Sequence, residues 1–581
     1  MHVLTGHHRE RPTLELAAAP PAIRRLWDRT LDRYPENKAR YLNLAIVVMA
    51  AIVLYYEFYV MASVTPSIIK QFGMTWPFFV YTIVVGNLVG AFASLVAGLS
   101  DRWGRANLVT YGLALTAVIV LVGLPHASSM WEFAALYSVL GFVEGIILVA
   151  TPALIRDFSP QVGRASAMGF WTMGPVIGSL AVSMVASHTL GHLTAWQDQF
   201  TICGIVGLVV FAIALFGLRE LAPGLRDQLM VSTRDRVLVE AKAAGIDPDK
   251  VLEHPWRQVL HLDIVGSSFG IGIFLVVYYT LIAFLVVYMA TIFHYTTQRA
   301  NALGNWMWAF NALALVFAGF ASDRLRVRKP FMVIGAVGAI ITTALFAIRA
   351  THPDTGYYTF VLILSLLAVS IGFVFSTWLA AFTETVEARN PALTATGLAI
   401  WGWTLRIVVA GSLFVLPYVV TTMTPLVEHG TEVQTVVAQY GPQLATLSVI
   451  DPATLARLSA NPADPVAGPT AVVEIMKAQQ VSQTVAVQRL TAAAAVPKAD
   501  LIYVTTYGPK VQAASKSSPQ EWQRWWWMCV AAEFVLLPFL FLMKGRWSPK
   551  KARQDYEEHT RKVDEALAAL HASQPAATVL R

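Results

Sequence analysis

The sequence is poor in charge and poorer still in cysteine. Only 14% of its 581 residues are charged, against about 25% in soluble proteins, and only two are cysteine. A soluble chain of this length would need several cores under a charged surface, and there is too little charge to cover them. Two cysteines in separate apolar runs exclude a disulfide scaffold. With 56% hydrophobic residues, 17 Trp and 29 Phe, the composition indicates a polytopic membrane protein.

Motifs for nucleotide or metal chemistry are missing as well. There is no Gly-Lys-Ser or Gly-Lys-Thr phosphate loop, and we find no nucleophile–base pair or metal-ligand cluster. We therefore expect no enzymatic activity, no catalytic residue, no cofactor and no metal. Residues 1–21 contain no uninterrupted apolar stretch, which argues against a cleaved signal peptide.

Apolar runs of membrane-crossing length occur twelve times. A transmembrane helix needs about 20 mostly apolar residues. Such runs lie at about 43–67, 77–99, 107–125, 132–155, 165–188, 199–218, 267–293, 300–321, 330–348, 357–382, 394–421 and 525–543. The sequence thus predicts an all-α membrane protein with twelve transmembrane helices.

The basic residues are distributed unevenly between the two sides. Thirty-two of the 43 Lys and Arg fall on one side, whereas the five short loops on the other side carry only Lys70, Arg299 and Arg349. Because Lys and Arg are retained in the cytoplasm, we predict a multi-pass protein of the cell (inner) membrane with both termini cytoplasmic. The net charge of +7 then reflects topology, so we expect the lipid bilayer and not nucleic acid as a partner.

Two internal repeats indicate a duplication of six helices. Ser-Asp-Arg occurs at 100–102 and again at 322–324, each time after the second apolar run of a set of six. Trp-Gln followed by Cys seven residues after the Trp occurs at 196–203 and at 522–529, at the start of the sixth and twelfth runs. Two independent matches at equivalent places predict two pseudo-symmetric six-helix bundles.

The second copy is 104 residues longer than the first between these motifs. Most of the excess lies between the eleventh and twelfth runs, where helix-start signals such as Asp451-Pro452 recur, so we predict an extracytoplasmic helical insertion, with a disordered loop as the alternative. The predicted units are a cytoplasmic tail at 1–42, a bundle at 43–218, a cytoplasmic linker at 219–266, helices 7–11 at 267–423, the insertion at 424–521, helix 12 at 522–544 and a cytoplasmic tail at 545–581.

The turn GLSDRWGR at 98–105, between spans two and three of a 6+6 chain, resembles the signature loop of the major facilitator superfamily. The resemblance covers about 43–421 and 525–543. It implies secondary transport by alternating access, with a turn whose contacts form in one state and break in another. The gating residues expected on this basis are Gly98, Asp101, Arg102, Gly104, Arg105, Asp157, Asp323 and Arg324.

Two alternatives accompany the gating assignment. The Arg residues of the turn can serve membrane topology alone, and the second copy lacks the second Gly region of the motif. In the second half, Arg389 with Glu384 and Glu387 is therefore an alternative gate.

Four charged residues lie inside apolar runs, where they are costly and are functional candidates. They are Glu57, Glu144, Arg406 and Glu533. Glu57, nine positions before Pro66, resembles the first-span acid of aromatic-acid and related metabolite:proton symporters. That family's usual Asp is Glu here, and Leu54-Tyr55-Tyr56 replaces its preceding Asp-Gly. We assign proton coupling to Glu57 and Glu144, with structural pairing to a neighbouring helix as the alternative.

Arg406 suits an organic anion, because its planar fork matches a carboxylate or phosphate and stays charged. Its alternative role is a structural partner for Glu144 or Glu533. Polar and aromatic residues within spans complete the candidate substrate site, with bonding between helices as their alternative. These are Asn87, Tyr278, Tyr279, Asn305, Asn311, Trp378 and Trp403.

The leading functional hypothesis is proton-coupled uptake of a small organic anion, a carboxylate metabolite. A proton-coupled exporter of drugs or metabolites is the alternative of the same class, because Gly174-Pro175 resembles the signature of proton-coupled drug antiporters. An alternative of another class is a non-transporting membrane sensor or assembly factor whose insertion binds an external partner.

Overall fold

Twelve helical stretches are long and apolar enough to cross a membrane in the part of the chain that the structure describes. The structure, a computed structural model, describes residues 27–95, 103–159, 169–223, 225–226, 258, 260–390, 393–545, 547–551, 553–554, 557–558, 561 and 565. The predicted all-α class and its twelve spans are confirmed. Only two strands of two residues each accompany the helices in these ranges, β1 (Thr30–Leu31) and β2 (Glu220–Leu221), which pair in parallel.

The first six spans form one half of the molecule, which we call the N half. It contains α2 (Asn37–Tyr59) continued by η1 (Val60–Val64) and α3 (Thr65–Phe72), α4 (Trp76–Leu95), α6 (Arg105–Val118) continued by η3 (Ile119–Gly123) and η4 (Leu124–His126), α7 (Met130–Phe158), α9 (Gly174–Thr189) and α10 (Trp196–Gly217). The first span changes its winding at η1, just before Pro66, which cannot donate a helical hydrogen bond. It ends at Gly73, whose φ of +57° favours glycine.

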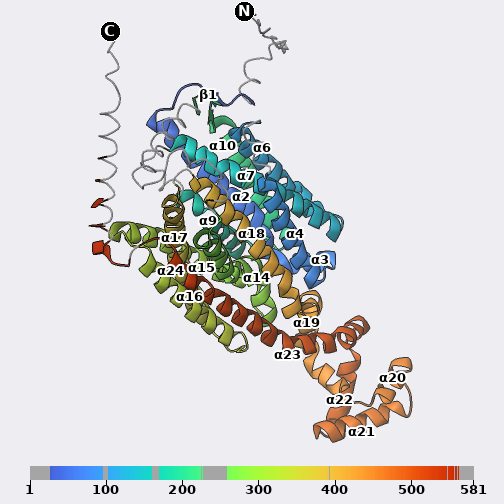
Figure 1. The fold of residues 1–581 in the computed structure, drawn as a ribbon. Coiled ribbons are helices and arrows are strands. Elements are labelled where there is room, and N and C mark those ends of the chain that lie inside the picture. The colour runs from blue at the N-terminus through green and yellow to red at the C-terminus, as the bar shows by residue number, and fades with distance from the viewer. Residues whose placement is uncertain are drawn as a thin grey trace, which may run out of the picture.

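The last six spans form the C half. It contains η6 (Leu262–Gly266) continued by α13 (Ser267–Phe274) and α14 (Val276–Ile292), α15 (Thr297–Leu325), α16 (Lys329–Arg349), α17 (Tyr357–Glu387), α18 (Thr394–Val419), and α23 (Lys498–Phe534) continued by α24 (Leu536–Leu542). The halves meet where α9 packs on α15 and where α4 packs on α18 (Figure 1).

The residues between α18 and the last span form helices beyond the bundle (Figure 1). These are α19 (Met423–Leu447), α20 (Pro452–Ala460), α21 (Ala467–Gln479), α22 (Gln483–Ala494) and the first part of α23. Helices α20, α21 and α22 pack with the end of α19 around a small core of their own: Ile450, Ala471, Ile475 and Ala486. Because α23 runs without a break from this region into the last span, the predicted boundary at residue 522 falls inside a helix. We call this end of the bundle the insertion end and the opposite end, where β1 meets β2, the linker end.

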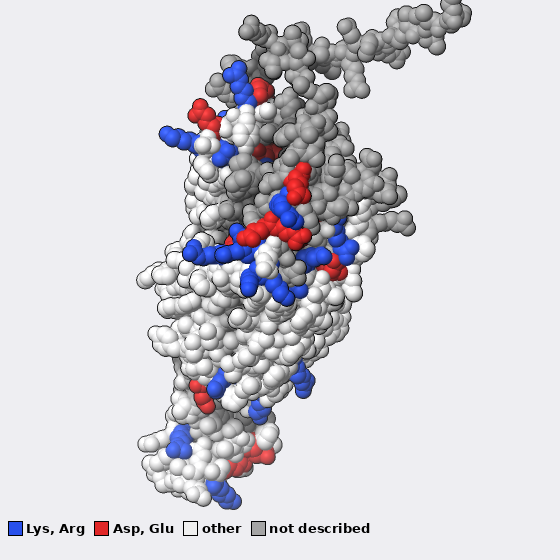
Figure 2. Space-filling view, turned by 60° about the vertical axis from the view of Figure 1, so that its left-hand side comes forward, with Lys and Arg blue, Asp and Glu red and all other residues white. Residues whose placement is uncertain are grey.

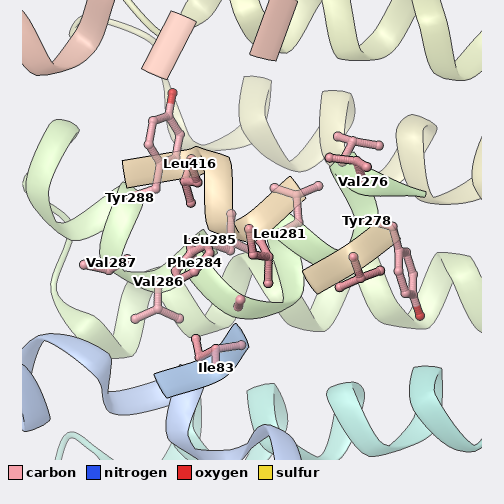
Figure 3. Packing of buried hydrophobic residues seen from close by; sticks show 14 of the residues in the cluster. Ile83, Val276, Tyr278, Leu281, Phe284, Leu285, Val286, Val287, Tyr288 and Leu416 are labelled. Carbon is pink, nitrogen blue, oxygen red and sulfur yellow. The ribbon is translucent and has the colours of Figure 1, made fainter. Parts of the chain in front are cut away.

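Helix α14 lies at the centre of the interface between the halves. Its buried side chains lie between Ile83 of α4 and Leu416 of α18 (Figure 3). The span to which α14 belongs has the largest buried share of the twelve, 83% of its most apolar window. A helix that is apolar on all sides is expected at such a central place.

On the face that Figure 2 shows, charged side chains are sparse around the middle of the bundle. On the face in Figure 2, Lys, Arg, Asp and Glu gather towards the linker end, and a largely uncharged band separates them from the charges near the insertion. Such a band is what a surface in contact with hydrocarbon requires.

Candidate functional site

An ion pair joins the two halves midway along their helices. Arg406 of α18 places its Nη2 at 3.1 Å from Oε2 and 3.2 Å from Oε1 of Glu144, which belongs to α7. The Glu144 side chain is 3% exposed and that of Arg406 is 17% exposed. Of the alternatives for Arg406, its structural partner is therefore Glu144 and not Glu533. Glu144 is the one carboxylate partner of Arg406 among the described residues, so this partly accessible Arg keeps donors for an anion.

Glycines on α4 and α7 make room for this pair. A Cβ on Gly90 would lie 2.7 Å from Nη1 of Arg406 and 3.3 Å from Oε2 of Glu144. A Cβ on Gly141 would lie 2.5 Å from the carbonyl oxygen of Gly86. Gly86 with Gly90 on α4, and Gly141 with Gly145 on α7, are two small-residue pairs four apart, the spacing that lets helix backbones approach closely in membranes. This close packing fixes where Glu144 meets Arg406.

Four tyrosines line the same region. Tyr55 and Tyr59 come from α2, with ring centroids 5.5 Å apart, and Tyr278 and Tyr279 come from α14, with centroids 5.4 Å apart. Tyr55 and Tyr279 each interact electrostatically with both Glu144 and Arg406. Of the predicted pair, Tyr279 is thus brought to the ion pair and Tyr278 contacts Tyr279, whereas Tyr55 and Tyr59 are neighbours that sequence reasoning missed. The shared Tyr-Tyr at 55–56 and 278–279 was the available signal.

A small cavity adjoins the tyrosines on the side of the insertion end. Its volume of about 30 Å³ is enough for one or two water molecules. Both halves contribute to its lining, which includes Tyr59, Ser63, Ser179, Ser183, Asn301 and Trp308. The hydroxyl of Ser179 is buried and has no hydrogen-bond partner among the described residues. The interface here is therefore incompletely filled, and its mostly apolar lining contains a few polar groups.

The other predicted substrate residues are engaged elsewhere or lie at the surface. Asn87 donates to the carbonyl of Ile83 in its own helix, 2.9 Å away. Asn305 joins the halves by donating to Ser187 Oγ at 2.8 Å. Asn311 donates to the Ala368 carbonyl within the C half at 2.6 Å. Trp378 is fully buried against Phe382, and Trp403 is 44% exposed. Their part in binding stays a prediction.

Glu57 does not join the central ion pair. It is fully buried inside the N half, where Oε2 accepts a hydrogen bond of 2.6 Å from Thr116 Oγ1. Its other carboxyl oxygen has no partner among the described residues. No contact between Glu57 and Arg406 therefore supports the predicted role of Glu57 in proton coupling.

At the linker end, an ion pair forms within the N half. Arg105 Nη1 lies 2.8 Å and 2.9 Å from the two carboxylate oxygens of Asp157, which joins the start of α6 to the end of α7. Both residues are among the predicted gating residues. Gly98, Asp101 and Arg102 lie outside the described residues.

Glu220 completes this turn and was missed by sequence reasoning. Its Oε2 accepts the backbone N–H of Arg105 at 2.8 Å, and its Oε1 occupies the space where a side chain on Gly104 would start. Gly104 also has φ of +87°, so both backbone and space require glycine there. Burial raises the pKa of the Glu220 carboxyl, against the hydrogen bond from Arg105. An acid directly after the sixth span was the available signal.

The C half has an equivalent arrangement around a different arginine. Arg328 pairs with Asp323 and with Glu384, whose Oε1 lies 3.0 Å from Arg328 Nε. Burial alone would lower the pKa of Arg328, but Glu384 and Asp323 outweigh it, so its pKa is raised. Arg324 is exposed at the same turn.

The alternative gate of Arg389 with Glu384 and Glu387 is wrong for Glu384, and the part of Glu387 stays a prediction. Arg389 instead binds Asp263 at 2.8 Å, and Glu384 binds Arg328. The registers of α16 and α17 decide the partners, and sequence spacing alone did not give them.

At the insertion end, polar contacts join opposite halves. Asn301 of α15 donates to the Ser63 carbonyl at 2.9 Å. Helix α19 adds an ion pair of 3.2 Å between Lys70 and Glu432. The hydroxyl of Thr424 accepts the backbone N–H of Trp76 at 3.0 Å. These contacts hold the insertion end closed.

Comparison with known proteins agrees with this architecture. The family model described as Major Facilitator Superfamily matches residues 26–422. A rice (Oryza sativa subsp. japonica) protein named "Probable anion transporter 3, chloroplastic" is 25% identical over 300 residues, 47% of this chain and 53% of that protein. The multidrug resistance protein MdtG of Citrobacter koseri is 29% identical over 204 residues, 34% of this chain and 49% of that protein.

Solved structures give the same result for the fold. The crystal structure of a bacterial homologue of the human lysosomal transporter Spinster, inward-facing and unoccupied, aligns with a TM-score of 0.52 at 15% identity. The alignment covers 84% of this chain and 99% of that one. The matches to the two named relatives span about half the length of each relative, so they do not carry those proteins' substrates over to this chain. The family model, in contrast, covers more than half of this chain, and the chain belongs to the Major Facilitator Superfamily.

Proposed function

We propose that this transporter carries out proton-coupled uptake of a small organic anion, a carboxylate metabolite, with Arg406 as the anion-binding residue. The observation that supports this most directly is the ion pair of 3.1 Å between Arg406 and Glu144. It lies between the halves, at mid-depth, which is where transporters of this architecture bind their substrates. The tyrosines around it supply hydroxyl donors and ring faces for the body of the substrate.

The pair offers a direct route to coupling. Arg406 keeps its charge, so what changes during the cycle is the anion that pairs with its guanidinium, either Glu144 or the substrate. While Glu144 is ionised it pairs with Arg406, and a second anion would have to displace it from a buried site. When Glu144 is protonated, Arg406 needs another anion, because a buried unpaired charge is strongly unfavourable. Proton and anion therefore enter together, and the step is electroneutral for a monoanion.

Alternating access would follow from the contacts at the two ends. The contacts at the insertion end join the halves, whereas the ion pairs of Arg105 and Arg328 brace each half separately. We assign the linker end to the cytoplasm of a cell (inner) membrane, with both termini cytoplasmic, because most Lys and Arg lie there. The insertion then lies outside the cell, where an external partner for it stays an open hypothesis.

Transport by the purified protein in liposomes tests the proposal. With the outside acidic, the wild type is expected to accumulate a carboxylate that a thermal-shift screen has identified. Glu144→Gln mimics the protonated acid, so it should lose proton-driven accumulation while it keeps substrate exchange. Arg406→Lys should weaken anion binding, because Lys lacks the planar fork.

Glu132→Gln is the matched control for the glutamate variant. Glu132 lies on the same helix, α7, at its exposed insertion-end start. It should keep wild-type accumulation. If Glu144→Gln still accumulates substrate against its gradient when protons drive uptake, the proposed coupling site is wrong.

A proton-coupled exporter is the second candidate. Gly174 and Gly178 of α9 lie against Tyr55, where a Cβ on Gly178 would come within 2.7 Å of that side chain. The Gly-Pro segment that resembles drug antiporters is therefore next to the site, and MdtG is among the relatives. An acid interior should drive accumulation by an antiporter and not by a symporter, which separates the two.

A further inference from the structure

Each half contains one glutamate that is fully buried and has no cation beside it among the described residues. In the N half this is Glu57 of α2, which accepts a hydrogen bond from Thr116 of α6 at 2.6 Å. In the C half it is Glu533 of α23, which accepts one from Thr343 of α16 at 2.7 Å. In both cases the second carboxyl oxygen is buried without a hydrogen-bond partner in the described part of the chain.

The two glutamates lie on different helices of their halves, yet they occupy equivalent places. From the Trp-Gln repeat, Gly207 is eleven residues after Trp196, and Glu533 is eleven residues after Trp522. Gly207 is therefore the N-half counterpart of Glu533. A Cβ on Gly207 would collide with Oε1 of Glu57. The carboxyl of Glu57 thus fills the space that the missing side chain of Gly207 leaves.

The surroundings of the two carboxyls match as well. Each accepts its hydrogen bond from a threonine on the third span of its half. Each also interacts electrostatically with the cysteine one turn earlier on the sixth span, Cys203 for Glu57 and Cys529 for Glu533. The N half has Tyr-Tyr-Glu at 55–57 and the C half has Tyr-Tyr-Thr at 278–280, so Thr280 is the counterpart of Glu57. Thr280 itself accepts a hydrogen bond from Trp525 Nε1 at 3.3 Å. The two places therefore share the threonine of the third span and the cysteine of the sixth span, and the helix that supplies the carboxyl differs.

The chemistry of the site favours the neutral acid. The thiol of Cys203 or Cys529 is the titratable group that faces each carboxyl, and no Lys, Arg or His of the described residues pairs with either. An ionised carboxylate in such a place would be a buried charge without compensation, which proteins avoid by keeping the group protonated. A protonated carboxyl both donates and accepts hydrogen bonds, which suits a contact between packed helices.

We propose that Glu57 and Glu533 form one duplicated site, in which a carboxylic acid stays protonated through the transport cycle and ties the third span of its half to the sixth span, and in the N half to the first span as well. The tie keeps each half rigid while the halves move, and the coupled proton is carried elsewhere. This inference rests on the proposed function in one respect, namely that Glu144 carries the coupled proton.

Moving the carboxyl of the N half from position 57 on the first span to position 207 on the sixth span tests whether the two places are equivalent. Glu57→Thr removes the carboxyl and Gly207→Glu adds one against the existing one, so each single variant should lower the Tm. The double variant E57T/G207E reproduces the arrangement of the C half and should recover much of the loss. If the double variant is as unstable as the sum of the two losses, the equivalence is wrong.

Isosteric variants test the protonated state. Glu57→Gln and Glu533→Gln replace a neutral acid by a neutral amide, so both should keep the Tm and the proton-to-substrate ratio of the wild type. Glu57→Ala and Glu533→Ala lose the hydrogen bond and leave a void, and should lower the Tm. In the wild type, the infrared carbonyl band of protonated carboxyls should persist from about pH 5 to about pH 8 and weaken in each Gln variant.

The outcome at Glu57 can be separated from that at Glu144. If Glu57→Gln loses proton-driven accumulation, or if the infrared band vanishes at neutral pH, the duplicated acid is a proton carrier and the inference is overturned. If Glu144→Gln keeps accumulation while both Gln variants of the duplicated site keep it too, the proposed coupling site fails and the inference stands.

Discussion

The two ends of the bundle use their polar groups in opposite ways. At the insertion end, Lys70 meets Glu432 and Asn301 meets the Ser63 carbonyl, so polar contacts join the N half to the C half. At the linker end, Arg105 meets Asp157 and Arg328 meets Glu384, so each ion pair closes within one half. Among the residues that the structure describes, the difference indicates two bodies that are braced separately at the linker end and held together at the insertion end, with Arg406 and Glu144 between them.

The largest effect is expected from fixing the insertion end. Lys70 and Glu432 are both about half exposed, with side-chain exposures of 55% and 48%, so cysteines there are accessible. A short bis-maleimide that cross-links Lys70→Cys to Glu432→Cys should abolish transport, because the halves can no longer part. Flux of substrate into liposomes before and after cross-linking measures the effect.

The single variant Lys70→Cys, treated with the same reagent, is the control and should keep its flux. The native Cys203 and Cys529 are buried and should not react. Full transport by the cross-linked protein would show that α19 does not separate from the N half during the cycle.

The next largest effect is expected at the centre. Arg406→Ala leaves Glu144 buried without its partner, which should cost about 3–5 kcal/mol of stability. The double variant R406A/E144A removes both charges and should be more stable than R406A alone. Thermal unfolding of the wild type, the two single variants and the double variant gives the coupling energy. Additive losses would mean that the pair of 3.1 Å contributes nothing to joining the halves.

Sequence reasoning reached the fold and the charged groups but not their partners. The twelve spans and the duplication follow from composition, because each apolar run must cross the bilayer by itself. Arg406 and Glu144 stood out as charges inside apolar runs, yet they are 262 residues apart, and only the packing of α4 against α7 and α18 brings them together. Glu57 stood out in the same way, and the packing of α10 places it away from them. Periodicity within one helix cannot give contacts between helices.

The contacts of the insertion show the same limit. Helix-start signals such as Asp451-Pro452 marked its helices, and α20 does begin at Pro452 with Asp451 as its cap. Nothing in the sequence indicated that Glu432 would meet Lys70, because this depends on how α19 leaves α18. Glu220, which sequence reasoning also missed, is a local case. The buried carboxyl of Glu220 binds the turn that Gly104 forms with its positive φ, so neither residue can be interpreted without the other.

A smaller effect should distinguish the two braces at the linker end. The Asp157 side chain is 8% exposed, whereas that of Glu384 is 42% exposed. Asp157→Asn should therefore cost about 1–3 kcal/mol, as expected for a buried charged hydrogen bond. Glu384→Gln should cost less than about 1 kcal/mol, because water screens its ion pair. Thermal unfolding measures both, and equal losses would contradict the difference in burial between the halves.

The smallest effect is expected at the tip of the insertion, away from the contacts that distinguish the two ends of the bundle. Asp464 Oδ1 accepts the backbone N–H groups of Val466 and Ala467, each at 2.9 Å, and its carboxylate pairs with Arg457 at 3.0 Å. The backbone hydrogen bonds, helped by Arg457, hold the pKa of Asp464 below its usual value. A carboxylate with a lowered pKa stabilises the fold above its unfolded pKa of about 4, and this stability is lost as the pH falls through the folded pKa.

Asp464→Asn keeps an acceptor for the two N–H groups but removes the titration. The difference in Tm between the wild type and this variant should therefore shrink between about pH 6 and about pH 3. Because the tip contacts neither brace, the flux of the variant at neutral pH should equal that of the wild type. A Tm difference that does not change with pH would contradict the role of the ionised carboxylate. A lowered flux would mean that the tip takes part in movements that the comparison of the two ends assigns to α19.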